Sequence, residues 1–172
     1  MKKIVLVVAP KDYRDEEYEE TKQALEEAGV SVYVASTDVT EAMGLKSGRA
    51  PVDFLLRNVS PNDFQGIVFI GGPGSKNYVG HDVAENLIRK FMSQGKVIGA
   101  ICYAPAILAK AGLLSGKRAT GWKTEDNEEV PDMIIRGGGT YVEEPIVVED
   151  NIVTAFNHQS AKEFGKTLAR ML

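Results

Sequence analysis

The single cysteine of the chain, Cys102, lies where an apolar run meets an amphipathic segment, in "GKVIGAICYAPAILAKAGLL" (residues 95–114). The apolar run predicts a strand and the segment after it predicts a helix, so the cysteine occupies the turn between them. Such a turn holds its side chain at the sheet edge, where unpaired N–H groups of the helix start point toward it. These groups would lower the pKa of the thiol and could hold an oxyanion. From position alone, the alternative is a small buried cysteine without a chemical role.

The residues around Cys102 favour a functional site. Four small neighbours let backbones approach closely: Gly99, Ala100, Ala104 and Ala106. Pro105 falls in the first turn of the predicted helix, where its missing N–H costs little. The glycine-rich "IGGPG" (residues 70–74) forms a second strand-to-turn junction that could face the cysteine. It is not a phosphate-binding P-loop, because no "GK[ST]" follows.

Three further features could contribute to a site. The acidic "YRDEEYEE" (residues 13–20) is either a solvated helix start or the source of one carboxylate turned toward Cys102, and periodicity cannot choose between its acids. His158 follows the final predicted strand, so it could reach the same sheet edge. Trp122 also follows a strand and could wall a pocket or serve packing. No Cys/His cluster has metal-ligand spacing, so we expect neither metal nor cofactor.

The elements that would position these residues alternate between strands and helices. Strands are predicted at 3–9, 30–36, 66–70, 96–101, near 117–122 and twice within 139–156 around a turn at 149–151; helices are predicted at 15–28, 82–94, 104–114 and about 160–171. An irregular segment at 40–64 suggests a hairpin. This order predicts an α/β fold with a mainly parallel sheet, which binds ligands at the carboxyl ends of its strands. The loop after Ala9, the turn after Ile70 and Cys102 itself all fall there.

Length and composition limit the class of protein. The 172 residues predict a single domain over residues 1–172, and a formal net charge of -4 argues against nucleic acid or an anionic membrane as partner. One cysteine excludes an intrachain disulfide and suits a reducing cytoplasm. No apolar stretch approaches the ~20 residues that cross a bilayer, and the short apolar N-terminus reads as a first strand rather than a signal peptide.

Taken together, the chain resembles the ThiJ/PfpI family, within the class I glutamine amidotransferase-like superfamily. The resemblance rests on "YRDEE", "VFIGGPG", "GKVIGAICYAPAILAKAGLLSGKRAT" and "DNIVTAF". It implies a flavodoxin-like three-layer α/β sandwich that forms homodimers or larger homo-oligomers. It also implies that Cys102 is the nucleophile, that Glu17 is the inward glutamate, and that the backbone N–H groups of Gly72 and Tyr103 are oxyanion donors.

The chain also departs from the family pattern. Protease-like members carry "CHGP" at the cysteine, where this chain has "CYAP" and places Tyr103 instead of histidine. They also use a glutamate after the double glycine, where this chain has "GGPGSKNY". Deglycase-like members often place a histidine near the position of Trp122. Neither set of partners can therefore be assembled from matching positions, and no general base is identified.

Three functions remain open. The first is an enzyme of the glyoxalase or deglycase type, a hydrolase or lyase in which Cys102 attacks a small carbonyl compound and Glu17 carries the proton. The second is a redox-responsive or chaperone-like stress protein whose Cys102 oxidises to a sulfinate. The third, intracellular peptide hydrolysis, is disfavoured because an amide leaving group needs protonation, usually by histidine.

Overall fold

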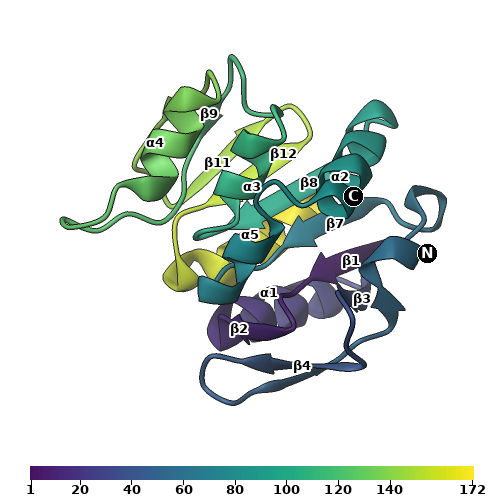
Figure 1. Cartoon of the computed structure of the whole chain (residues 1–172). Helices are drawn as coiled ribbons and strands as arrows, with labels where there is room; N and C mark the ends of the chain where they lie inside the picture. The colour runs from purple at the N-terminus through teal and green to yellow at the C-terminus, as the bar shows by residue number, and fades with distance from the viewer.

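The computed structural model describes residues 1–172. Its central sheet, which is drawn in Figure 1, has seven strands. The strand order is β11-β12-β8-β7-β1-β3-β6, and all neighbours are parallel except the β11–β12 hairpin. The strands are β1 (Lys3–Val7), β3 (Ser31–Ser36), β6 (Phe54–Leu55), β7 (Gly66–Phe69), β8 (Val97–Ile101), β11 (Ile146–Glu149) and β12 (Ile152–Ala155). This is the mainly parallel sheet that the sequence predicts.

Helices cover both faces of the sheet and give three layers. The helices are α1 (Asp15–Glu27), α2 (Asp82–Ser93), α3 (Pro105–Lys110), α4 (Glu129–Arg136) and α5 (Ala161–Met171). Side chains of α1 and α5 share one core with Ile4 and Leu6 of β1. Side chains of α2, α3 and α4 share the other core with Val5 and Val7. Because neighbouring residues of β1 point to opposite cores, the strand must be apolar throughout.

Short elements extend the three layers. A three-stranded sheet joins β2 (Lys11–Tyr13), β4 (Glu41–Gly44) and β5 (Arg49–Pro51), and a two-stranded sheet joins β9 (Arg118–Ala119) with β10 (Thr140–Tyr141). The hairpin expected within 40–64 is β4–β5. Single turns of 3₁₀ helix are η1 (Leu56–Asn58), η2 (Pro61–Asp63) and η4 (His158–Ser160), and η3 (Pro73–Tyr78) is longer. Neither β2 nor α4 was predicted from the sequence.

The carboxyl ends of the central parallel strands lie at one edge of the sheet, where α1, η3 and α3 begin. The chain leaves β1 toward β2 and α1, leaves β7 toward "GGPG", and leaves β8 at Cys102. Strands adjacent in space but distant in sequence thus bring three chain segments to one place. None of the helices is both long enough and apolar enough to cross a membrane.

Candidate active site

Cys102 occupies a sharp turn between β8 and α3 with its backbone in the left-handed region, at φ 62°. Few residues other than glycine adopt this conformation. Two hydrogen bonds hold it in place: the Cys102 N–H donates to the Ala155 carbonyl at 2.9 Å, and the Trp122 N–H donates to the Cys102 carbonyl at 2.7 Å. The turn is therefore fixed from two sides, by the end of β12 and by the loop after β9.

Glu17, in the first turn of α1, is fully buried beside the thiol. Its Oε2 accepts a hydrogen bond from the Gly71 N–H at 2.9 Å, while Oε1 is buried with no nitrogen or oxygen partner. The carboxyl group interacts with the Cys102 thiol. Its neighbours face elsewhere, because Glu16 pairs with Arg14 and Lys46. The structure thus brings together the two residues that the family resemblance selects.

Burial shifts the ionisation of both acidic groups. It raises the pKa of Glu17 from 4.5 to about 8, although hydrogen bonds from Cys102 and Gly71 oppose the shift. Burial also raises the pKa of the Cys102 thiol, and the Glu17 carboxylate raises it further by its charge. The Tyr103 N–H and the charge of Arg14 act in the opposite direction.

The expectation of a thiol pKa lowered by its position alone is therefore wrong. The thiol opens only partly to solvent, and the helix that follows it, α3, has just six residues. Desolvation of the thiolate outweighs the short helix dipole. The influence of Glu17 depends on its proton: a carboxylate repels the thiolate, whereas a carboxylic acid can donate to it. With a pKa of about 8, Glu17 is mostly protonated at neutral pH.

Two backbone donors belong to residues that line the pocket with the thiol. Neither the Gly72 N–H nor the Tyr103 N–H donates to a backbone oxygen, and both residues border the same pocket as Cys102. Gly72 has φ 103°, and a Cβ there would lie 2.5 Å from the Arg14 nitrogen. Only glycine fits this position. N–H groups beside a nucleophile that are not engaged by oxygen are the donors that an oxyanion requires.

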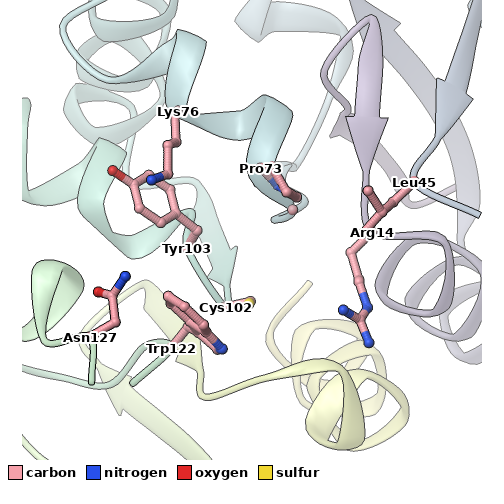
Figure 2. A pocket seen from close by; sticks show the side chains of 9 residues that line it. Arg14, Leu45, Pro73, Lys76, Cys102, Tyr103, Trp122 and Asn127 are labelled. Carbon is pink, nitrogen blue, oxygen red and sulfur yellow. The ribbon is translucent and has the colours of Figure 1, made fainter. Parts of the chain in front are cut away.

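The pocket over Cys102 has a volume of about 250 Å³. Figure 2 shows Trp122 beside the cysteine and Arg14 across the opening from it. The pocket is lined by Arg14, Leu45, Gly72, Pro73, Lys76, Cys102, Tyr103, Trp122 and Asn127. The lining includes Trp122, one of the two residues suggested from sequence as pocket residues. Elsewhere, no three His, Cys, Asp or Glu side chains are grouped to hold a metal ion.

His158, the other suggested residue, does not line the pocket. Its Nδ1 lies 3.4 Å from Arg14 Nη2, so the arginine stands between the imidazole and the opening. The cause is local: η4 follows β12 and turns His158 toward the start of α1. His158 can thus influence the pocket through Arg14.

A side-chain cluster at the pocket wall was missed by sequence reasoning. The Tyr103 hydroxyl donates to Glu129 Oε1 at 2.8 Å, Lys76 donates to Glu129 Oε2 at 3.1 Å, and the Lys76 ammonium lies 5.0 Å from the centre of the Tyr103 ring. Figure 2 shows Lys76 against this ring. Burial raises the pKa of Tyr103, and its bond to Glu129 raises it further. Tyr103 is consequently a fixed neutral wall rather than a base.

Sequence comparison agrees with this architecture. A sequence model of the DJ-1/PfpI family matches residues 2–171. The chain belongs to the DJ-1/PfpI family. An uncharacterised protein of Methanocaldococcus jannaschii is 36% identical over 164 residues, which cover 95% of this chain and 78% of that protein. Among solved structures, a ThiJ/PfpI domain protein from Brachyspira murdochii superposes with a TM-score of 0.92 at 28% identity, covering 98% of this chain and 95% of that one.

Family relatives with assigned names differ in the activity they are named for. A deglycase of Pyrococcus horikoshii is 29% identical over 88% of each chain. A glutathione-independent glyoxalase of Caenorhabditis elegans is 27% identical over 99% of this chain and 89% of that protein. A putative cysteine protease of Bacillus subtilis is 27% identical over 100% of this chain and 99% of that protein.

Proposed function

We propose that the protein is a cysteine-dependent enzyme that acts on small reactive carbonyl compounds or the groups they glycate. The observation that carries this proposal is the buried Glu17 carboxyl beside Cys102, with its Oε1 lacking a nitrogen or oxygen partner. The N–H groups of Gly72 and Tyr103 donate to no backbone oxygen, and both residues line the same pocket as the thiol. A nucleophile, a proton carrier and oxyanion donors suffice for carbonyl addition, which needs no histidine to protonate an amine.

The proposed addition step uses these groups in order. The Cys102 sulfur attacks the carbonyl carbon of an aldehyde, a C–S bond forms, and the electron pair of the C=O bond moves to oxygen. The N–H groups of Gly72 and Tyr103 stabilise this oxyanion, and Glu17 supplies the proton that completes a hemithioacetal. The pair enters this step with one proton, as the Cys102 thiolate and protonated Glu17, so the sulfur adds to carbon, the Glu17 proton adds to oxygen, and no oxidant or reductant is consumed. The Glu17 carboxylate left behind is then a base next to the adduct.

The size and lining of the pocket support a small substrate. A volume of about 250 Å³ lies below the usual range for drug-sized ligands, ~300–1,000 Å³. Trp122 and Leu45 give the pocket apolar walls. The names of the Pyrococcus and Caenorhabditis relatives point to carbonyl chemistry in those proteins and support the proposal by similarity.

The test follows methylglyoxal consumption by the purified protein. We expect turnover that is abolished in Cys102→Ser and reduced in Glu17→Gln by about 10²–10⁴-fold, the contribution of a positioned proton carrier. Arg49→Gln, which removes an exposed, ion-paired arginine that does not line the pocket, serves as the control and should retain turnover. Turnover that survives in Cys102→Ser would overturn the proposal.

A second candidate function is a response to peroxide, favoured by the partial exposure of Cys102 to the pocket. One peroxide would oxidise the thiolate to sulfenate with release of water, and a second would give sulfinate. A protonated Glu17 could donate a hydrogen bond to the sulfinate. Intact mass after peroxide treatment should then show two added oxygen atoms in the wild type and none in Cys102→Ser. Lack of methylglyoxal turnover together with this oxidation would favour the second function.

A further inference from the structure

The charge of the pocket differs from that of the chain. Two charged residues line the pocket, Arg14 and Lys76, and both are cations, whereas the chain carries a formal net charge of -4. No aspartate or glutamate borders the opening. A small substrate entering this pocket therefore meets positive charge.

The two cations are not equivalent. Lys76 pairs with Glu129, which leaves that pair neutral. Arg14 Nε pairs with Glu16 Oε2 at 2.9 Å, but Glu16 Oε1 also binds the ammonium group of Lys46. Two cations thus share one carboxylate, and the group of three keeps one positive charge in excess. The excess lies on the Arg14 side of the pocket, across from Cys102 in Figure 2.

Arg14 also has donors to spare. Its Nη2 contacts His158 Nδ1 at 3.4 Å, and since a guanidinium only donates, Nδ1 is the acceptor in this contact. Its Nη1 makes no hydrogen bond in the protein, and 29% of the side chain is exposed. Held by Glu16 and His158, the guanidinium is positioned in advance for a carboxylate or phosphate, which it can bind through two parallel hydrogen bonds.

We propose that Arg14 binds an anionic group of the substrate, so that the site selects small aldehydes carrying a carboxylate or phosphate close to the reacting carbonyl. This inference rests on the proposed function, because it assigns the substrate class of the same pocket. Cys102 forms the adduct with the carbonyl carbon while Arg14 anchors the charged end. Neutral methylglyoxal lacks that anchor and is a minimal probe of the chemistry.

The test measures how aldehydes protect Cys102 from alkylation by iodoacetamide. Two matched pairs separate the carboxylate from the phosphate: glyoxylate against propionaldehyde, and glycolaldehyde phosphate against glycolaldehyde. The variants are Arg14→Gln, which removes the charge, and Arg14→Lys, which keeps the charge but lacks the planar guanidinium that makes two parallel hydrogen bonds. Arg49→Gln is the matched control, because it removes one exposed, ion-paired arginine on β5, away from the pocket lining.

We expect Arg14→Gln to raise the half-protecting concentration of glyoxylate or glycolaldehyde phosphate about tenfold and to leave the neutral aldehydes within about twofold. Tenfold corresponds to ~1.4 kcal/mol, the size of one partly exposed charge-assisted contact. Arg14→Lys should lie between Arg14→Gln and the wild type, and Arg49→Gln should match the wild type. The anion whose protection depends on Arg14 is the preferred one.

Two outcomes separate this inference from the proposed function. If the protein turns over methylglyoxal but protection by the anions is unchanged in both Arg14 variants, the anion site is overturned and the proposed reaction is supported. If protection depends on Arg14 but the protein does not turn over methylglyoxal, the anion site is supported and the proposed reaction is overturned. A folded Arg14→Lys variant, shown by an unchanged urea midpoint, keeps the test decisive if Arg14→Gln is unstable.

Discussion

At the scale of single residues, the centre of the molecule is an acid pair. Cys102 and Glu17 are both held away from water; the Glu17 carboxylate makes ionisation of the thiol more costly, whereas a hydrogen bond from the thiol favours the carboxylate. Groups coupled in this way release their protons as a pair. A single negative charge shared between sulfur and carboxyl oxygen is the state that arises first as pH rises. Reactivity of the thiol therefore depends on which group keeps the remaining proton.

Substitution of Glu17 should lower the pKa of the thiol. Glu17→Gln removes the negative charge and retains an N–H donor for the thiolate, whereas Glu17→Leu removes both. Rates of iodoacetamide labelling across pH should give the lowest thiol pKa in Glu17→Gln, an intermediate value in Glu17→Leu and the highest in the wild type. Identical titrations in the two variants would show that Glu17 makes no hydrogen bond to the sulfur.

The same carboxyl predicts how stability varies with pH. Its pKa is raised from 4.5 to about 8 on folding, so the folded state binds the extra proton between those values. The associated stability is complete below pH 4.5 and is lost as pH rises through 8. The full difference is roughly 5 kcal/mol. Urea unfolding should therefore show wild-type stability falling over this window relative to Glu17→Gln; parallel curves would contradict the raised pKa.

At the scale of elements, the site depends on how closely β7 and its glycine turn approach α1. A Cβ on Gly71 would lie 2.7 Å from Glu17 Oε2 and 2.9 Å from Cys102 Cβ, and one on Gly72 would meet backbone at 2.5 Å. These two glycines let the carboxyl, the thiol and the backbone donors share one small volume. Asp15 adds a second anchor, because it accepts the N–H groups of Lys46 and Gly48 and ties the β4–β5 hairpin to α1.

Gly72→Ala should be far more damaging than an alanine at another left-handed glycine. Gly95 has φ 66°, and a Cβ added there would have nothing within 4 Å, so Gly95→Ala meets conformational strain alone, ~1 kcal/mol. Gly72→Ala adds a clash with the backbone around Arg14, and we expect at least ~3 kcal/mol in total. Urea denaturation of both variants checks the difference, and equal losses would show that the turn relaxes freely.

The sequence alone was sufficient to predict the helices and strands that have a clear local pattern of apolar and polar residues. Alternating strands and helices predicted the parallel sheet, and the change from an apolar run to an amphipathic segment predicted the turn at Cys102. Adjacent acids such as Glu16 and Glu17 could not be separated, because the rotation of α1 is set by packing against α5. Family resemblance was needed to choose Glu17. The cluster of Lys76, Tyr103 and Glu129 joins three distant segments, and no local signal links them.

At the scale of the whole molecule, the side chains that surround the pocket limit the reactions it can support. Tyr103 stands where protease-like relatives carry histidine, and its hydroxyl is bound to Glu129. His158 lies behind Arg14. No imidazole lines the pocket to protonate an amine leaving group. The family resemblance further implies a homo-oligomer, which remains a prediction for sedimentation equilibrium to test.

We accordingly expect negligible peptidase activity, despite the name of the Bacillus relative. Casein and fluorogenic aminoacyl amides should remain uncleaved by the wild type, His158→Ala and Cys102→Ala alike. A missing general acid–base typically costs on the order of 10²–10⁴-fold in rate. Hydrolysis lost in Cys102→Ala but retained in His158→Ala would reveal a different base, and loss in both would make His158 the partner after all.

At the left-handed turn of Cys102, the residue that would best stabilise the backbone, glycine, is not the residue that provides a reactive thiol. Glycine adopts φ 62° without the ~1–2 kcal/mol penalty that other residues incur, so Cys102→Gly should unfold at higher urea than Cys102→Ala, which keeps the strain. Equal midpoints would show that the turn is unstrained. A population of variants screened for heat resistance alone would therefore tend to lose its only thiol, and retention of cysteine at this turn would itself report selection for reactivity.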